Sequence, residues 1–346
     1  MAAGRGHRVR LERVTHRFGE LAAVRDIDLE VGAGELLALL GPSGCGKSTL
    51  LRIVSGFIAQ SEGRVMFDDE PVDHLAPNRR GAGIVFQNYA LFPHMTVREN
   101  VAYGLEAQRW PRSRIAQRVE EMLALVHMGE YAARLPRHLS GGQQQRIALA
   151  RCLAVDPKVL LLDEPFGALD KNLRLDMQIE VKRLQRAYGI TTILVTHDQE
   201  EALSMADRIA VMNRGGIEQV AAPTDIYDRP ATLFVNRFVG TTNLVPAALA
   251  AAWVPALAAS ATVSVRPEQL RVHREAGDGR LAATVKAVLP LGPVVIYEAE
   301  IDGGVALKIS QPREGDAVML EPGAPVFIAP VSRAACRVFA AQSPTL

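Results

Sequence analysis

The chain has 346 residues, enough for about two domains that each bury a hydrophobic core. Its 39 Lys and Arg residues against 38 Asp and Glu residues leave a formal net charge of +1, which provides no global field for binding DNA or an anionic bilayer. A hydrophobic fraction of 48% with 22% charged residues is typical of a globular protein and favours neither a disordered chain nor a polytopic membrane protein.

The first residues, Met1–Arg8, are basic and are not followed by an apolar stretch of about 7–15 residues, so we expect no secretory signal. Cys45, Cys152 and Cys336 have neither paired nor metal-ligand spacing. Few cysteines without such spacing are typical of proteins in a reducing compartment, and we expect a cytosolic chain.

The first predicted element is a buried strand, a glycine-rich turn and an apolar helix between Glu35 and Gly56. The turn reads GPSGCGKS and fits the P-loop pattern G-x-x-x-x-G-K-[ST]; the alternative is an ordinary glycine turn. In a P-loop, backbone N–H groups hold phosphates, Lys47 would reach the β- and γ-phosphates, and Ser48 would bind Mg²⁺. The same N–H groups and Lys47 predict a favoured thiolate at Cys45. The expected nucleotide-binding residues of this turn are Gly41, Ser43, Gly44, Cys45, Gly46, Lys47, Ser48 and Thr49.

A helical stretch follows, which we predict to be an inserted subdomain at about residues 95–157. Thr96 with Glu99 forms a capping-box pattern, and Arg112–Val126 keeps helical spacing. Ser140 occupies an N-cap position, and two glycines after it leave the start of the next helix bare. Such a helix N-terminus binds anions. One nucleotide can contact both this helix N-terminus and that of the P-loop helix only if the two helices approach it from opposite sides.

Two further buried strands end in polar residues. Val159–Leu162 is followed by Asp163 and Glu164, and Thr191–Thr196 by His197. With the strand before the P-loop, they predict a parallel sheet whose site lies along one edge. Asp163 could hold a metal and Glu164 could take a proton from attacking water, although the pair could instead cap the next helix.

After residue 240, short alternating runs predict a small, barrel-like β domain over 240–346, behind an α/β domain at 1–239. Phe238–Val265 contains no charged residue and is long enough to cross a bilayer. Because it is rich in Ala, Ser and Thr and is broken by Pro246 and Pro255, we expect a surface helix and a linker instead.

Together these motifs resemble the ATP-binding cassette (ABC) ATPases over residues 18–243. The resemblance implies a P-loop core with an inserted helical subdomain, and it implies ATP and Mg²⁺ as ligands. It places Phe18 against adenine and makes Gln87 the sensor of Mg²⁺ and water. The implied catalytic residues are Glu164, His197 and Gln87, and the implied metal ligands are Ser48, Gln87 and Asp163.

The resemblance also implies a homodimer in which the signature of one copy covers the γ-phosphate held by the other. The matching signature residues are Ser140, Gly141, Gly142 and Gln143, and Asp170 matches the loop that crosses the dimer.

Several features select a branch of this family. Roughly 115 residues separate Lys47 from Asp163 without a heptad pattern, which argues against the coiled-coil chromosome and repair ATPases. A single cassette argues against the two-cassette translation factors. The stretches Phe86–Val97, Thr196–Ala202 and Tyr227–Pro230 resemble importer ATPases for polyamines, ferric iron, 2-aminoethylphosphonate and sugars, which end in a β domain of the TOBE type.

The polyamine (spermidine/putrescine) group is the most similar of these, although the Ala-rich segment 247–261 departs from the usual β-domain pattern. We expect separate transmembrane permease chains, an indirect link to a solute-binding protein, and a peripheral location on the cytoplasmic face of the bacterial inner membrane. An exposed apolar groove near Gln87 and 89–94 is the expected permease dock; a packed loop is the alternative. A soluble ABC-type ATPase acting on nucleic acid or ribosomes remains the second hypothesis, but the charge and the β domain favour the importer, and no nucleic acid is expected.

Overall fold

The computed structural model describes residues 6–167, 169–313 and 319–340. The chain divides into two units, Met1–Ile226 and Tyr227–Leu346. The second unit starts ahead of the boundary expected at 240, because helix α8 (Leu233–Phe238) is bonded to strand β12 (Thr262–Val265). Ser264 donates a hydrogen bond to the Asn236 side chain at 2.7 Å, and Arg266 donates to the Asn236 carbonyl at 3.1 Å.

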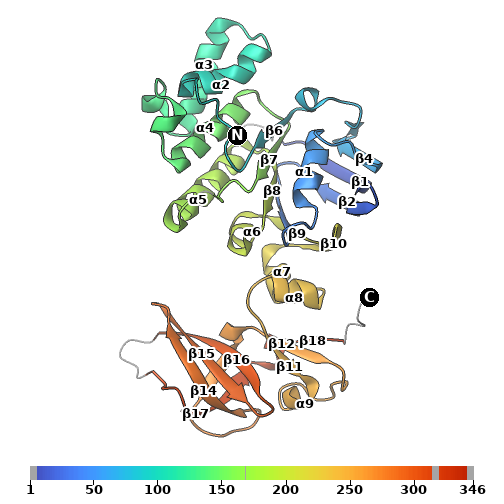
Figure 1. Cartoon of the computed structure of the whole chain (residues 1–346), viewed down its shortest axis with the longest axis vertical. Coiled ribbons are helices and arrows are strands. Elements are labelled where there is room, and N and C mark those ends of the chain that lie inside the picture. Colours follow the sequence, from blue (N-terminus) through green and yellow to red (C-terminus); the bar gives the residue numbers. More distant parts are fainter. Residues whose placement is uncertain (1–5, 168, 314–318, 341–346) are drawn as a thin grey trace. The chain divides into compact units, whose positions relative to one another are not determined.

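The first unit is built on a six-stranded sheet of order β10-β9-β3-β8-β7-β6 (Figure 1). All its neighbouring pairs are parallel except β9 and β10. The polar strand ends therefore share one edge, as predicted. The strands are β3 (Leu36–Leu40), β6 (Ala82–Val85), β7 (Val159–Asp163), β8 (Thr191–Thr196), β9 (Arg208–Asn213) and β10 (Gly216–Ala221).

A second, antiparallel sheet of order β2-β1-β4-β5 was not among the predicted elements. Helix α1 (Lys47–Ser55) contacts both sheets and shares one hydrophobic core with them. The P-loop helix is thereby fixed from two sides. The strands are β1 (Val9–Phe18), β2 (Leu21–Val31), β4 (Glu62–Phe67) and β5 (Glu70–Pro71).

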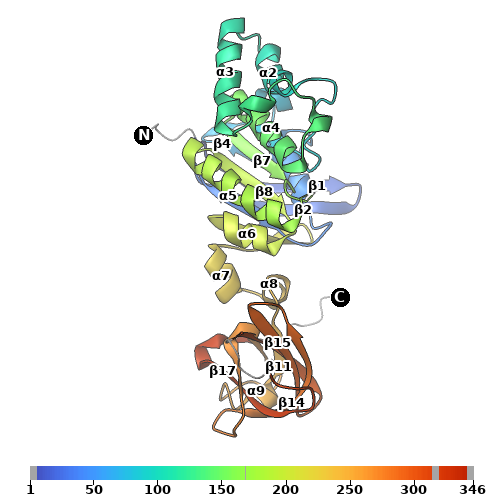
Figure 2. The same ribbon diagram turned by 90° about the vertical axis from the view of Figure 1, so that its left-hand side faces the viewer.

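The helical insertion follows β6 and consists of α2 (Val97–Ala107), α3 (Arg112–Leu125) and α4 (Gly141–Ala154). The predicted Thr96–Glu99 capping box is present. Helices α5 (Lys171–Tyr188) and α6 (Gln199–Met205) lie across one face of the central sheet (Figure 2). The short 3₁₀ turns of this unit are Pro77–Arg79, Gly129–Tyr131 and Pro136–His138.

The second unit contains a three-stranded and a five-stranded antiparallel sheet around one core, which confirms the predicted small β domain. Their orders are β11-β12-β18 and β13-β17-β14-β15-β16. The remaining elements of this unit are α8, α9 (Ala247–Ala250), and 3₁₀ turns at Pro267–Gln269 and Arg333–Ala335, while α7 (Pro223–Asp228) spans the boundary between the two units. The strands are β11 (Asn243–Pro246), β12, β13 (Leu270–His273), β14 (Leu281–Pro290), β15 (Val294–Ile301), β16 (Val305–Pro312), β17 (Pro325–Pro330) and β18 (Cys336–Phe339).

The uncharged segment 238–265 is part of this β unit. It supplies β11, α9 and β12, and Trp253 is buried with its indole N–H donating to the Gly279 carbonyl at 2.9 Å. Among the described helices, none combines the length and the apolar character needed to cross a membrane.

Candidate functional site

The predicted P-loop joins β3 to α1, and its backbone conformation requires glycine. Gly46, which precedes α1, has φ of 104°, and a Cβ there would lie 2.3 Å from the Ala23 carbonyl oxygen. A Cβ at Gly41 would lie 2.4 Å from the carbonyl oxygen of Met212. The loop therefore passes close to neighbouring backbone at two points, which only glycine allows.

Lys47 is 5% exposed, and its ammonium group lies within the P-loop. Its Nζ donates hydrogen bonds to the carbonyls of Gly41 at 2.7 Å and Pro42 at 3.0 Å. A cation held beside a helix N-terminus, on a loop of backbone N–H groups, is suited to bind phosphate oxygens.

Ser48 joins the P-loop helix to the end of β7, because its hydroxyl donates to Asp163 Oδ1 at 3.3 Å. Burial raises the pKa of Asp163, although Ser48 and Arg52 oppose this shift. The described residues contain no cluster of three His, Cys, Asp or Glu side chains suited to a metal. The hydroxyl and carboxylate fit Mg²⁺, which binds few protein oxygens and takes its other ligands from water and phosphate.

Cys45 differs from the sequence-based expectation. Its Sγ lies 3.9 Å from Lys47 Nζ, but the residue is 3% exposed, and burial raises the pKa of its thiol despite the nearby cation. The prediction of a favoured thiolate was wrong because burial outweighs the attraction of Lys47.

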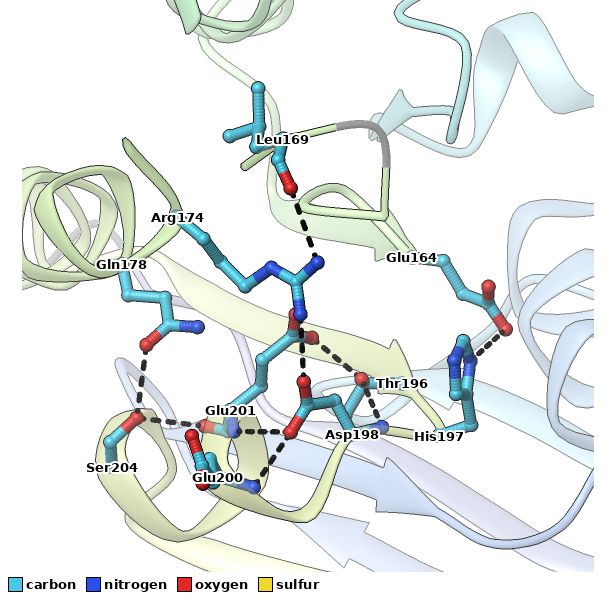
Figure 3. A network of polar contacts seen from close by, with 10 residues as sticks. All are labelled: Glu164, Leu169, Arg174, Gln178, Thr196, His197, Asp198, Glu200, Glu201 and Ser204. Carbon is cyan, nitrogen blue, oxygen red and sulfur yellow. Dashed lines mark hydrogen bonds and ion pairs between the residues drawn. The ribbon is translucent and has the colours of Figure 1, made fainter. Parts of the chain in front are cut away.

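Glu164 and His197 lie side by side after the neighbouring strands β7 and β8 (Figure 3). Glu164 Oε1 is 3.1 Å from His197 Nδ1. Glu164 has φ of 46°, a left-handed conformation that is rare outside glycine, and its backbone N–H donates to the Val195 carbonyl at 2.9 Å. A strained residue at a strand end is typical of functional sites, and a carboxylate paired with a histidine can accept a proton.

Gln87 follows β6 and is exposed. A Cβ at Gly167 would lie 3.3 Å from Gln87 Nε2, so the Gln87 side chain lies against the loop after Glu164. The structure therefore brings an amide from a third strand to the same edge of the sheet.

The turn after Gln87 is only partly exposed. Tyr89 is 4% exposed, which is contrary to the expected aromatic groove, whereas Pro93 and His94 are exposed. Tyr89 and the next residue both have positive φ, and Arg151 fixes the turn by donating to both of their carbonyls.

Phe18 ends β1 and is 53% exposed. The His16 ring meets it edge to face, with 4.6 Å between the ring centroids. The free face of Phe18 is available for stacking on a planar base.

The predicted signature residues form the start of α4. Ser140 caps the helix by accepting from the Gln143 N–H, and the Gln143 side chain accepts from the Ser140 N–H at 3.0 Å. A Cβ at Gly141 would lie 3.2 Å from Leu169 Cδ2, so the start of α4 packs against the loop before α5. Asp170 caps α5 by accepting from the Leu173 N–H.

The chain matches two known families. The profile of the ABC transporter family matches residues 24–167, and that of the TOBE domain matches residues 263–339. The spermidine/putrescine import ATP-binding protein PotA of Rubrobacter xylanophilus is 46% identical over 348 aligned positions, which cover 94% of this chain and 92% of that protein. The sulfate/thiosulfate import ATP-binding protein CysA of Gloeobacter violaceus is 46% identical over 320 positions, or 92% of each chain.

A solved structure supports the same fold. The ATP-binding cassette MJ0796, a dimer in a post-hydrolysis state bound to ADP and Pi, matches with a TM-score of 0.55 and 32% identity. The match covers 62% of this chain and 98% of that one.

Proposed function

The chain belongs to the ABC transporter family as an importer ATP-binding subunit with ATPase activity, and we propose that in this role it energises polyamine uptake. Support for polyamine comes from relatives such as PotA of Nitratidesulfovibrio vulgaris, which is 54% identical over 70% of this chain. Sulfate is the second candidate, because CysA relatives reach the same 46% identity as PotA over most of the chain.

The proposed hydrolysis uses residues at the ends of four strands of the central sheet, β3, β6, β7 and β8. Lys47 and the N–H groups of the P-loop bind the phosphates, and Phe18 stacks on the adenine. When bound by Ser48, Asp163 and Gln87, Mg²⁺ would neutralise charge on the phosphate oxygens. Glu164 would take the proton of the attacking water, and His197, whose Nδ1 lies 3.1 Å from Glu164 Oε1, would orient the carboxylate beside the γ-phosphate.

The second half of the site comes from another copy of the chain. In one chain, the P-loop and the start of α4 would each present a helix N-terminus to the same nucleotide, which requires them to face it from opposite sides. We propose an ATP-bound homodimer in which Ser140, Gly141, Gly142 and Gln143 of one copy cover the γ-phosphate held by the other, with Asp170 near the dimer axis. Closure and reopening of this dimer would move the permease.

The permease is proposed to bind the exposed part of the turn after Gln87, at Pro93 and His94, next to the half-buried Phe92. Phe92 packs against Tyr103, with 4.5 Å between their centroids, and this contact steadies the surface. The chain would thus be peripheral on the cytoplasmic face of the inner membrane and would meet a solute-binding protein only through the permease.

The observation that carries the ATPase site is the Ser48–Asp163 contact, since it joins the phosphate loop to the carboxylates at the end of β7. The substrate is tested by reconstituting the chain with its permease in vesicles. Spermidine with its binding protein should raise ATP turnover, while sulfate with its binding protein should not. The reverse result would assign the chain to sulfate.

A further inference from the structure

Arg174, in the first turn of α5, joins two segments that border the Glu164–His197 pair (Figure 3). Its Nη1 donates to Asp198 Oδ2 at 3.0 Å, and its Nη2 donates to the Leu169 carbonyl at 3.2 Å. Its Nε is buried and has no hydrogen-bond partner within the described residues. Two different nitrogens of the guanidinium thus make the contacts to Asp198 and to Leu169.

The turn that carries His197 is anchored on both sides. Thr196, which is 2% exposed, donates from its hydroxyl to Glu201 Oε2 at 2.6 Å and accepts from the Asp198 N–H at 2.9 Å. Asp198 Oδ1 caps α6 by accepting from the Glu200 and Glu201 N–H groups. Asp198 Oδ2 is then bound to Arg174, so the position of the turn depends on α5.

The other segment follows Glu164. Two backbone hydrogen bonds hold it: the Gly167 N–H donates to the Glu164 carbonyl at 3.3 Å, and the Leu169 N–H donates to the Phe166 carbonyl at 3.1 Å. Arg174 therefore completes a continuous series of contacts that links Leu169, Glu164, His197 and Asp198.

We propose that Arg174 is a positioning residue that sets the Glu164–His197 geometry by holding the Leu169 loop and the Asp198 turn together. The inference rests on the proposed hydrolytic role of that pair. A planar guanidinium can donate in two fixed directions at once, which a lysine ammonium cannot reproduce at this spacing. The Leu169 side chain also packs against Gly141 at the start of α4. A partner bound at the start of α4 would therefore act on the Glu164–His197 pair through Leu169.

The test compares Arg174→Ala and Arg174→Lys with two matched controls on α5. Lys182→Ala removes the bond from Lys182 Nζ to the Ser204 carbonyl, at 2.9 Å, which also joins α5 to α6 but lies away from the pair. Arg183→Ala removes an exposed arginine of the same helix. We expect kcat to fall about 10- to 100-fold in Arg174→Ala with KM for ATP nearly unchanged, since the geometry and not the binding is altered. Arg174→Lys should be intermediate, and both controls should keep the activity of the unmodified chain.

Asp198→Asn should lower kcat similarly, and the double variant should be no worse than either single variant, because both break the same link. Amide hydrogen exchange gives a readout that does not depend on hydrolysis. Exchange should rise in 164–170 and 197–201 together in both Arg174 variants, more strongly in Arg174→Ala, but not in Lys182→Ala. Full kcat in Arg174→Ala, or an equal loss in Lys182→Ala, would overturn the proposal. An unmodified chain without ATPase activity would instead refute the proposed function, and the exchange experiment would still decide on the Arg174 link.

Discussion

Replacing Glu164 by Gln removes the proton acceptor but keeps the shape of the side chain. The Gln amide can still hydrogen-bond to His197, which lies 3.1 Å from the present carboxylate oxygen. General base catalysis contributes about 10²–10⁴ in rate, so we expect turnover to fall by that factor, or about 3–5 kcal/mol of transition-state stabilisation.

Folding should be nearly unaffected by the same change. The side chains of the pair are 24% and 58% exposed, and an ion pair that is open to solvent contributes less than about 1 kcal/mol to the free energy of unfolding. The melting temperature should therefore move by no more than about 4 °C. A larger shift would mean that lost activity reflects lost structure.

The assay measures phosphate release at saturating Mg-ATP, with size-exclusion chromatography of the same samples. Glu164→Gln should bind ATP, hydrolyse it slowly and accumulate an ATP-dependent dimer. Adding Ser140→Arg should abolish that dimer, because a bulky cation then occupies the signature while the P-loop stays intact. Hydrolysis at the unmodified rate would remove Glu164 from the mechanism, and an inactive protein that stays monomeric with Mg-ATP would contradict the two-copy site.

Three further predictions concern other parts of the chain. Burial raises the pKa of Glu201 above its ordinary value of 4.5, so from about that pH upward the folded state binds more protons than the unfolded state, and the free energy of unfolding falls as the pH rises. Glu201→Gln should flatten this pH dependence in thermal melts, and an unchanged profile would contradict the prediction. Cys45, with its raised pKa and 3% exposure, should react with iodoacetamide at pH 7 far more slowly than a free thiol, and Mg-ATP should slow it further; fast labelling that ignores nucleotide would argue against the phosphate loop. A chain truncated after Ile226 should bind ATP like the full chain in calorimetry. A chain ending at Asn243 should be less soluble, because α8 loses its hydrogen bonds to Ser264 and Arg266. A Met1–Ile226 chain that folds but does not bind ATP would refute the assignment of nucleotide binding to the first unit.

The sequence was sufficient where local chemistry determines structure. The P-loop glycines and the strand ends at Asp163 and His197 could be located because buried parallel strands are continuous apolar runs that end in polar residues. The β1–β2 pair was not predicted, because the alternation of buried and exposed residues along β1 is broken. Val9 and Leu11 are buried, but irregular register between Leu11 and Val14, with Arg13 at φ of 46°, moves the next buried residue out of a period of two.

Other parts of the site depend on tertiary packing. The ionisation of Cys45 is governed by burial, which the surrounding motif does not reveal. Arg174 stands in an ordinary helical run, and its partners Leu169 and Asp198 come from other segments, so only the fold brings them together. Likewise, the burial of Tyr89 follows from a turn with two successive positive φ angles, which its sequence does not indicate.

Mixing two inactive variants shows whether one nucleotide site is shared by two copies of the chain. Lys47→Ala lacks the phosphate-binding cation but keeps its signature, while Ser140→Arg keeps its P-loop but has a blocked signature. In a mixed dimer, one site combines the intact P-loop of one copy with the intact signature of the other. One of the two sites in each mixed dimer is intact, so ATP turnover should reappear in the mixture, at no more than about half of the unmodified rate. If the mixture stays as inactive as each variant alone, the shared site is contradicted.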